Sequence, residues 1–103
     1  MRNEDIGVFY AEKVMGWELV GNEWIQNGMS TQWTAEGPNS FSPQTNPSHM
    51  WHVTRNLEQQ GVLVEVNKNY CTLKNMETGK TLASASGITR FDAIYNATTQ
   101  VFQ

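Results

Sequence analysis

The chain has 103 residues, enough for one domain with a hydrophobic core of its own. Its 10 acidic and 7 basic residues leave a formal charge of −3, and the basic residues are scattered without a run. This distribution argues against a protein that coats duplex DNA or RNA, which needs a concentrated positive face, but it allows a small anionic ligand.

A single cysteine, Cys71, excludes an internal disulfide. Since no signal peptide is recognisable, this fits a reducing cytoplasm. No apolar run approaches the roughly 18 to 20 residues that span a bilayer. We therefore expect a single-domain cytoplasmic protein, residues 1–103, with no membrane partner.

A first helix is predicted over residues 4–15, with Asn3 as its N-cap and Gly16 at its C-terminal end. The acidic residues in its first turn complement the helix dipole. Four apolar residues at helical spacing form its expected buried stripe: Ile6, Phe9, Tyr10 and Val14.

Two extended segments, residues 17–26 and 29–33, follow the first helix. They are joined by Asn27-Gly28, a pair that favours the positive φ angles of a tight hairpin turn. Residues 35–46 contain Gly-Pro and Ser-Pro pairs and no periodic apolar pattern, so they are predicted to form an irregular loop.

A second helix is predicted from Asn46 as N-cap, with Pro47 at its first position, to Gln60, and it ends at Gly61. Trp51 is expected in the core, on an apolar face made of Met50, Trp51, Thr54 and Leu57. A more polar face is expected to contain His49, His52, Arg55 and Gln59.

Three strands, residues 62–66, 70–76 and 80–86, are separated by short polar turns and predict an antiparallel meander. Thr89 is the expected N-cap of a last helix, with Asp92 completing an imperfect capping box. The buried side chains of that helix are expected to be Phe91, Ile94, Tyr95, Val101 and Phe102.

The predicted fold class is α+β, in the order α-β-β-α-β-β-β-α. A three-strand meander and an additional hairpin form the antiparallel sheet structure, and helices pack on it. The second half has the element order of a double-stranded-RNA-binding domain, but such domains carry a Lys-rich start to the last helix. Here that segment is GITRFDAI, with Arg90 as its single basic residue, so we reject that interpretation.

Two groups were weighed as catalytic or metal-binding residues. His49 and His52 lie three residues apart on the second helix, but no third residue has recognisable zinc spacing, so they are predicted to be polar-face residues. Cys71 lies in a predicted strand, where a small buried residue is the ordinary role. No phosphate loop, nucleophile elbow or paired-carboxylate motif is present, so the sequence predicts neither an enzyme nor a cofactor.

Binding is the remaining interpretation. The predicted helix N-termini at 46–49 and 89–92 offer free N–H groups and a positive dipole end, and Arg90 is placed to pair with a phosphate. Trp33, Trp51 and Tyr70 offer faces on which a nucleobase can stack. The predicted ligand-binding residues are Trp33, Ser42, Thr45, Asn46, Ser48, His49, His52 and Arg90.

Three segments carry a resemblance to a known family: AEKVMGW (11–17), FSPQTNPSHMW (41–51) and GITRFDAIYNAT (87–98). In this order, over nearly the whole chain, they resemble the phage ABA sandwich domain family of small phage and prophage proteins, typified by a Bacillus protein. The chain departs from the family pattern at Arg90 and Phe91, which stand where smaller or proline-like residues are expected. The resemblance implies a layered α/β/α arrangement and a phage accessory protein acting in the cytoplasm of the infected host bacterium.

Together with the missing catalytic motifs, the resemblance leads us to expect an anti-defence sponge. Such a homo-oligomer would sequester a nucleotide-derived immune signal, of the ADP-ribose type made by TIR defence enzymes, in pockets at subunit junctions. Three alternatives stay open. The first is an inhibitor of a host protein. The second is a phosphodiesterase-like enzyme with His49 and His52 as its acid–base pair. The third is a phage structural or regulatory factor.

Overall fold

Within residues 3–102, the computed structural model contains three α-helices, a short π-helix and six strands, with side chains described for residues 6–102. In chain order these elements are α1 (Asn3–Phe9), η1 (Tyr10–Val14), β1 (Glu18–Val20), β2 (Glu23–Gln26), β3 (Met29–Thr34), α2 (Pro47–Gln59), β4 (Val62–Asn67), β5 (Tyr70–Asn75), β6 (Thr81–Ser86) and α3 (Arg90–Val101). The predicted α+β class is confirmed.

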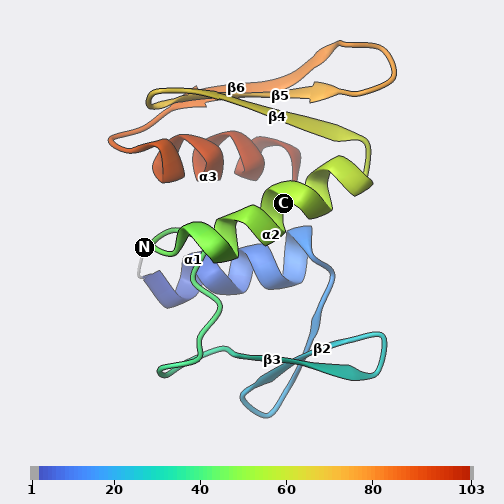
Figure 1. The fold of residues 1–103 in the computed structure, drawn as a ribbon, viewed down its shortest axis with the longest axis vertical. Helices are drawn as coiled ribbons and strands as arrows, with labels where there is room; N and C mark the ends of the chain where they lie inside the picture. Colours follow the sequence, from blue (N-terminus) through green and yellow to red (C-terminus); the bar gives the residue numbers. More distant parts are fainter. Residues whose placement is uncertain (1–2, 103) are drawn as a thin grey trace.

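The helices form the middle of the molecule, between two small antiparallel sheets (Figure 1). The β4-β5-β6 sheet lies against α3 and part of α2, and the β1-β2-β3 sheet lies beyond α1 at the opposite end. This arrangement differs from the α/β/α layering that the resemblance implied. A sheet of three short strands has one apolar face to bury, and a shared helical layer covers both sheets.

The first helix changes its pitch part way along. The N–H of Met15 donates to the carbonyl of Tyr10 over 2.9 Å, a bond across five residues, where a single α-helix was predicted. The wider turn brings Tyr10, Ala11 and Val14 together in the core. Gly16 (φ +73°) ends the helix, as predicted. The predicted cap by Asn3 lies outside the described side chains.

The hairpin prediction is confirmed at its turn, where Asn27 and Gly28 have φ angles of 53° and 80° between β2 and β3. The segment predicted as one strand over 17–26 is interrupted at Gly21 (φ 66°) and forms both β1 and β2. The positive φ of Gly21 makes a turn within that segment, and this turn adds a third strand to the sheet.

The predicted meander is also confirmed. Leu73 at the centre of β5 pairs with Val64 of β4 on one side and Ala83 of β6 on the other. Leu73 and Ala83 are buried and Val64 is half-buried against the core. The alternate residues of these strands therefore form the face that packs on the helices.

The ends of α2 follow the prediction, and its buried face follows it only in part, because Met50 and Leu57 are buried as predicted. Asn46 caps the helix through its side-chain oxygen and Gly61 (φ 85°) follows its end. The buried residues are Met50, Val53 and Leu57, whereas Trp51 is 54% exposed, so the prediction of a core Trp51 was wrong. The 50-53-57 spacing centres the stripe on Val53, and Trp51 lies about 100° round the helix from Met50.

The last helix begins as predicted, with a capping box. The N–H of Asp92 donates to Thr89 Oγ1 and the N–H of Thr89 donates to Asp92 Oδ2, both over 3.2 Å. Ile94 is buried as expected, but Val101 is 37% exposed, so its predicted burial was wrong. Small residues, Ala93 and Ala97, occupy the centre of the buried face and let the helix approach the sheet closely.

Candidate functional site

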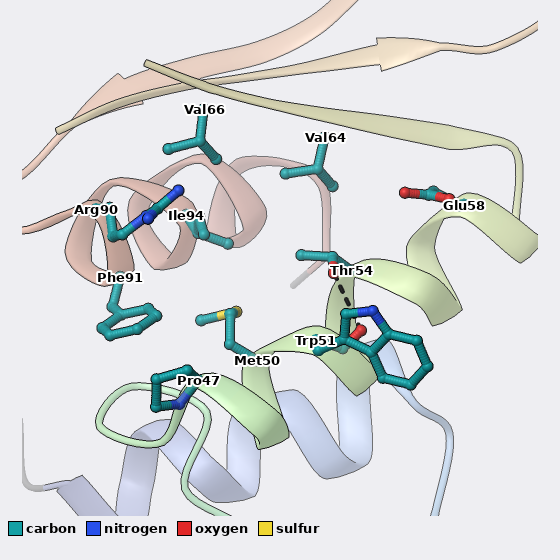
Figure 2. Close-up of a pocket in the computed structure, with 10 residues that line it drawn as sticks. All are labelled: Pro47, Met50, Trp51, Thr54, Glu58, Val64, Val66, Arg90, Phe91 and Ile94. Carbon is teal, nitrogen blue, oxygen red and sulfur yellow. Dashed lines mark hydrogen bonds between the residues drawn. The ribbon is translucent and has the colours of Figure 1, made fainter. Parts of the chain in front are cut away.

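An open cavity of about 470 Å³ lies between α2, α3 and β4 (Figure 2). We call it the α2–α3 cavity. Its lining combines apolar groups, two rings and one cation: Pro47, Met50, Trp51, Val64, Arg90 and Phe91. The apolar floor follows from the packing of the helices on the sheet, because Met50 and Ile94 are core residues that also reach the cavity.

The two aromatic rings of the cavity come from different helices. Figure 2 shows Phe91 on the α3 side and Trp51 on the α2 side, with Met50 between them. Arg55 lies one turn after Trp51, and its guanidinium carbon is 5.1 Å from the indole centroid. This contact orients an indole that is otherwise largely exposed.

Two charged side chains line the α2–α3 cavity, Arg90 and Glu58. They stand at opposite ends of it in Figure 2. Arg90 occupies the first turn of α3, next to the positive end of the helix dipole. The Arg90 end therefore favours a negatively charged group, and the Glu58 end disfavours one.

Trp33, His49 and His52 from the predicted site are brought together. The ring centroid of Trp33 lies 5.3 Å from that of His49 and 5.0 Å from that of His52. Trp33 also stacks on Trp17 at 5.5 Å, so it belongs partly to the core edge. The N–H of Ser42 donates to His49 Nδ1 over 2.9 Å, which joins the loop to this group.

The loop residues of the predicted site already use their backbone N–H groups within the protein. Asn46 Oδ1 accepts from the N–H groups of Ser48 and His49, so the expectation of free N–H groups there was wrong. The N–H of Thr45 donates to the carbonyl of Ser42. Asp92, at the other helix start, likewise bonds to Thr89. Neither helix N-terminus offers a full set of donors to a ligand.

The predicted site is divided by α2. Arg90 lines the α2–α3 cavity, whereas Trp33, Asn46 and His49 line a different hollow of about 370 Å³. The sequence did not place Trp51 with Arg90, because Trp51 was assigned to the core. A usable indication was the i,i+4 spacing of Trp51 and Arg55, which stabilises a pair on an exposed helix face.

The remaining chemistry is sparse. No group of three or more His, Cys, Asp or Glu side chains that could hold a metal ion is found among the described residues. Cys71 is fully buried, and burial raises the pKa of its thiol to about 11. Within the described range, no helix is long and apolar enough to cross a membrane.

No protein-family model matches this chain, and no curated protein is significantly similar to it. The crystal structure of a phage protein from Bacillus cereus ATCC 14579 is similar, with a TM-score of 0.63 and 21% sequence identity. The similarity covers 94% of this chain and 88% of that one. At this identity, the comparison shows a shared fold.

Proposed function

We propose that this chain is a phage-encoded, non-enzymatic binding protein that sequesters a nucleotide-derived signal in the α2–α3 cavity. One observation carries the proposal: an open cavity combines an apolar floor, rings on two sides and a cation at one end. The fold shared with a Bacillus cereus phage protein supports the phage origin.

The chemistry of a nucleotide matches this lining. A base packs against an aromatic ring, and base–aromatic stacking contributes about 1 to 3 kcal/mol per base. A phosphate pairs with Arg90 through two parallel hydrogen bonds, and Glu58 at the far end sets the orientation by repulsion. The cavity volume of about 470 Å³ lies within the usual range for small-molecule sites.

The lining also favours sequestration over turnover. Its titratable side chains are Glu58 and Arg90, at opposite ends. His49 and His52, the acid–base pair of a phosphodiesterase, line other hollows. His49 Nδ1 already accepts the Ser42 N–H. A ligand in the α2–α3 cavity therefore meets no paired acid and base.

The test is native mass spectrometry against a panel of cyclic dinucleotides and ADP-ribose derivatives, with the released ligand checked for chemical change. We expect one unmodified nucleotide bound at a fixed ratio per oligomer. Arg90→Gln should weaken its affinity by about tenfold or more, since a charge-assisted bidentate contact is lost. Lys80→Gln removes a cation that does not line the cavity and should leave the affinity unchanged.

Three results would contradict the proposal. A chemically altered ligand would indicate an enzyme. Equal binding by wild type and Arg90→Gln would place the ligand elsewhere on the molecule. No binding to the whole panel would favour a protein that inhibits a host partner.

A further inference from the structure

A histidine of α2, His49, holds the loop over residues 35–46 through a hydrogen bond and a ring contact. The backbone N–H of Ser42 donates to His49 Nδ1 over 2.9 Å. The imidazole also stacks on Phe41, with ring centroids 5.4 Å apart and planes at 15°. Phe41 is 2% exposed and Pro43 is fully buried, so the loop is packed down on both sides of this bond.

This hydrogen bond requires one protonation state. Nδ1 accepts only when it carries no proton, so His49 is the neutral tautomer with its hydrogen on Nε2. Adding a proton at Nδ1 places two donors, Nδ1–H and the Ser42 N–H, against each other. The bond must then break, and the positive ring stays beside Phe41 and Trp33.

We infer that the hydrogen bond between His49 and the loop is a pH-sensitive contact. Protonation of His49 breaks its bond to the Ser42 N–H and loosens the loop from the start of α2. The packing of Phe41 keeps the loop docked, so the change is a local opening at Ser42. It enlarges access to the hollow lined by Trp33, Asn46 and His49. This goes beyond the proposed ligand site, because His49 does not line the α2–α3 cavity.

The environment of His49 sets the pH at which its hydrogen bond to Ser42 breaks. Burial, and then the neighbouring His52, lowers the pKa of His49 below its ordinary value of 6.5. The groups that contact His49 from the loop and from β3, Phe41, Ser42 and Trp33, do not titrate. The other charged residues of these elements are Glu36 in the loop and Arg55 and Glu58 in α2, and none forms an ion pair with His49 among the described residues. The bond is therefore intact at neutral pH and breaks as the pH falls through the lowered pKa of His49, which lies below 6.5.

The experiment is NMR on the whole protein. Imidazole ¹⁵N shifts report the tautomer and titration of His49, and hydrogen exchange reports the protection of the Ser42 amide after correction for the intrinsic rate. We expect the Nε2–H tautomer at pH 7. Ser42 protection should fall by about fivefold to tenfold once His49 is protonated, which corresponds to one neutral hydrogen bond.

Two variants distinguish this role of His49 from a nonspecific destabilisation of the protein at low pH. In His49→Gln, nothing titrates at this position, so Ser42 protection should stay constant over the same pH range. His52→Gln is the matched control, because His52 also contacts Trp33 but accepts no bond from the loop. It should keep the wild-type pH dependence, shifted to slightly higher pH because a neighbouring charge is removed.

The inference is overturned by any of three results. His49 carries its proton on Nδ1 at neutral pH. Ser42 protection stays unchanged while the imidazole titrates. His49→Gln loses protection on acidification as the wild type does. The tautomer measurement needs only the wild-type protein, so it holds even if a variant fails to fold.

Discussion

The four tryptophans of this chain have unequal environments. Trp24 is 1% exposed and Trp17 is 6% exposed, Trp33 lies at the core edge, and Trp51 is 54% exposed. A ring of this size contributes strongly to stability when it is buried and little when it lies on the surface. The difference separates the tryptophans that form the core from one whose ring lies largely on the surface.

Trp24→Ala and Trp51→Ala should therefore lose very different amounts of stability in urea unfolding. We expect Trp24→Ala to lose about 3 to 5 kcal/mol of unfolding free energy, through lost burial and a residual cavity. Trp51→Ala should lose less than about 1 kcal/mol, since it removes an exposed ring and its contact with Arg55. A large loss from Trp51→Ala would mean that this indole is covered in solution, as at a subunit junction.

The thiol of Cys71 should resist alkylation in the folded protein. It is fully buried, and burial raises its pKa to about 11, so at pH 8 the thiolate that would react is scarce and shielded. Iodoacetamide labelling should be slow at pH 8 and become fast in denaturant. Rapid labelling without denaturant would show that β5 opens readily. Cys71→Ser, which places a hydroxyl in an apolar site, tests the same burial through its stability.

At the scale of elements, two packing constraints hold the helices in place. The first is the contact between α1 and the loop. A Cβ built on Gly7 would lie 2.2 Å from the Phe41 carbonyl oxygen, so only glycine fits between them. The second is the capping box at the start of α3.

Gly7→Ala should destabilise the protein although alanine is the better helix former. Ordinary helix propensity predicts a gain of roughly 0.5 to 1 kcal/mol. The clash with Phe41 should outweigh it and give a net loss of about 1 to 3 kcal/mol. Thermal unfolding measures the sign directly. A variant that is more stable than the wild type would refute the close approach.

Thr89→Ala should cost about 1 kcal/mol of unfolding free energy, because the N–H of Asp92 loses its acceptor at the start of α3. Thr89→Ser keeps the oxygen and serves as the control, with an expected change of only a few tenths of a kcal/mol. If the two variants are equally unstable, the contribution of Thr89 comes from its methyl group and not from the cap.

At the scale of the whole molecule, two small sheets share one helical layer (Figure 1). The loop over residues 35–46 connects β3 of one sheet to α2 of that layer, and its Phe41 packs on Trp17, Trp33 and His49. Aromatic and imidazole contacts through this loop therefore help to attach the β1-β2-β3 sheet to the helices. Acid should therefore weaken the attachment of the β1-β2-β3 sheet before it affects the β4-β5-β6 sheet.

The unfolding free energy should fall as the pH decreases from 7 to 5. The folded-state pKa of His49 is lowered below 6.5, so the unfolded chain binds the proton more readily. Stability is then fully present above pH 6.5 and declines as the pH falls toward the lowered value. Urea titrations at several pH values measure this slope, and His49→Gln should have a smaller one. Parallel slopes would mean that other groups account for the acid sensitivity.

Much of the fold was predictable because its determinants are local. The turn at Asn27-Gly28, the caps at Asn46 and Thr89 and the helix end at Gly61 depend on the conformations that a few neighbouring residues prefer. The burial of Cys71 within the β4-β5-β6 sheet also followed from its position in a strand. In each case, the residue type nearly determines the backbone conformation.

The predicted binding residues were partly brought together, and the tertiary structure decided which. Trp33, His49 and His52 meet because the Trp33 ring of β3 contacts both imidazoles of α2, a contact between segments separated by a long loop. Arg90 instead lies with Trp51 and Phe91 across the other side of α2. Sequence spacing does not specify the side of a helix on which a distant element packs.

By itself, then, the sequence determined the class of fold, the turns, the caps and the meander, because these depend on interactions within a few residues. The tertiary structure alone decided that Val53 and not Trp51 is buried, that Gly7 must lie against Phe41, and that α2 separates two hollows. These outcomes depend on how helices and sheets fill space together. Close packing couples residues far apart in the chain, and no local pattern encodes that coupling.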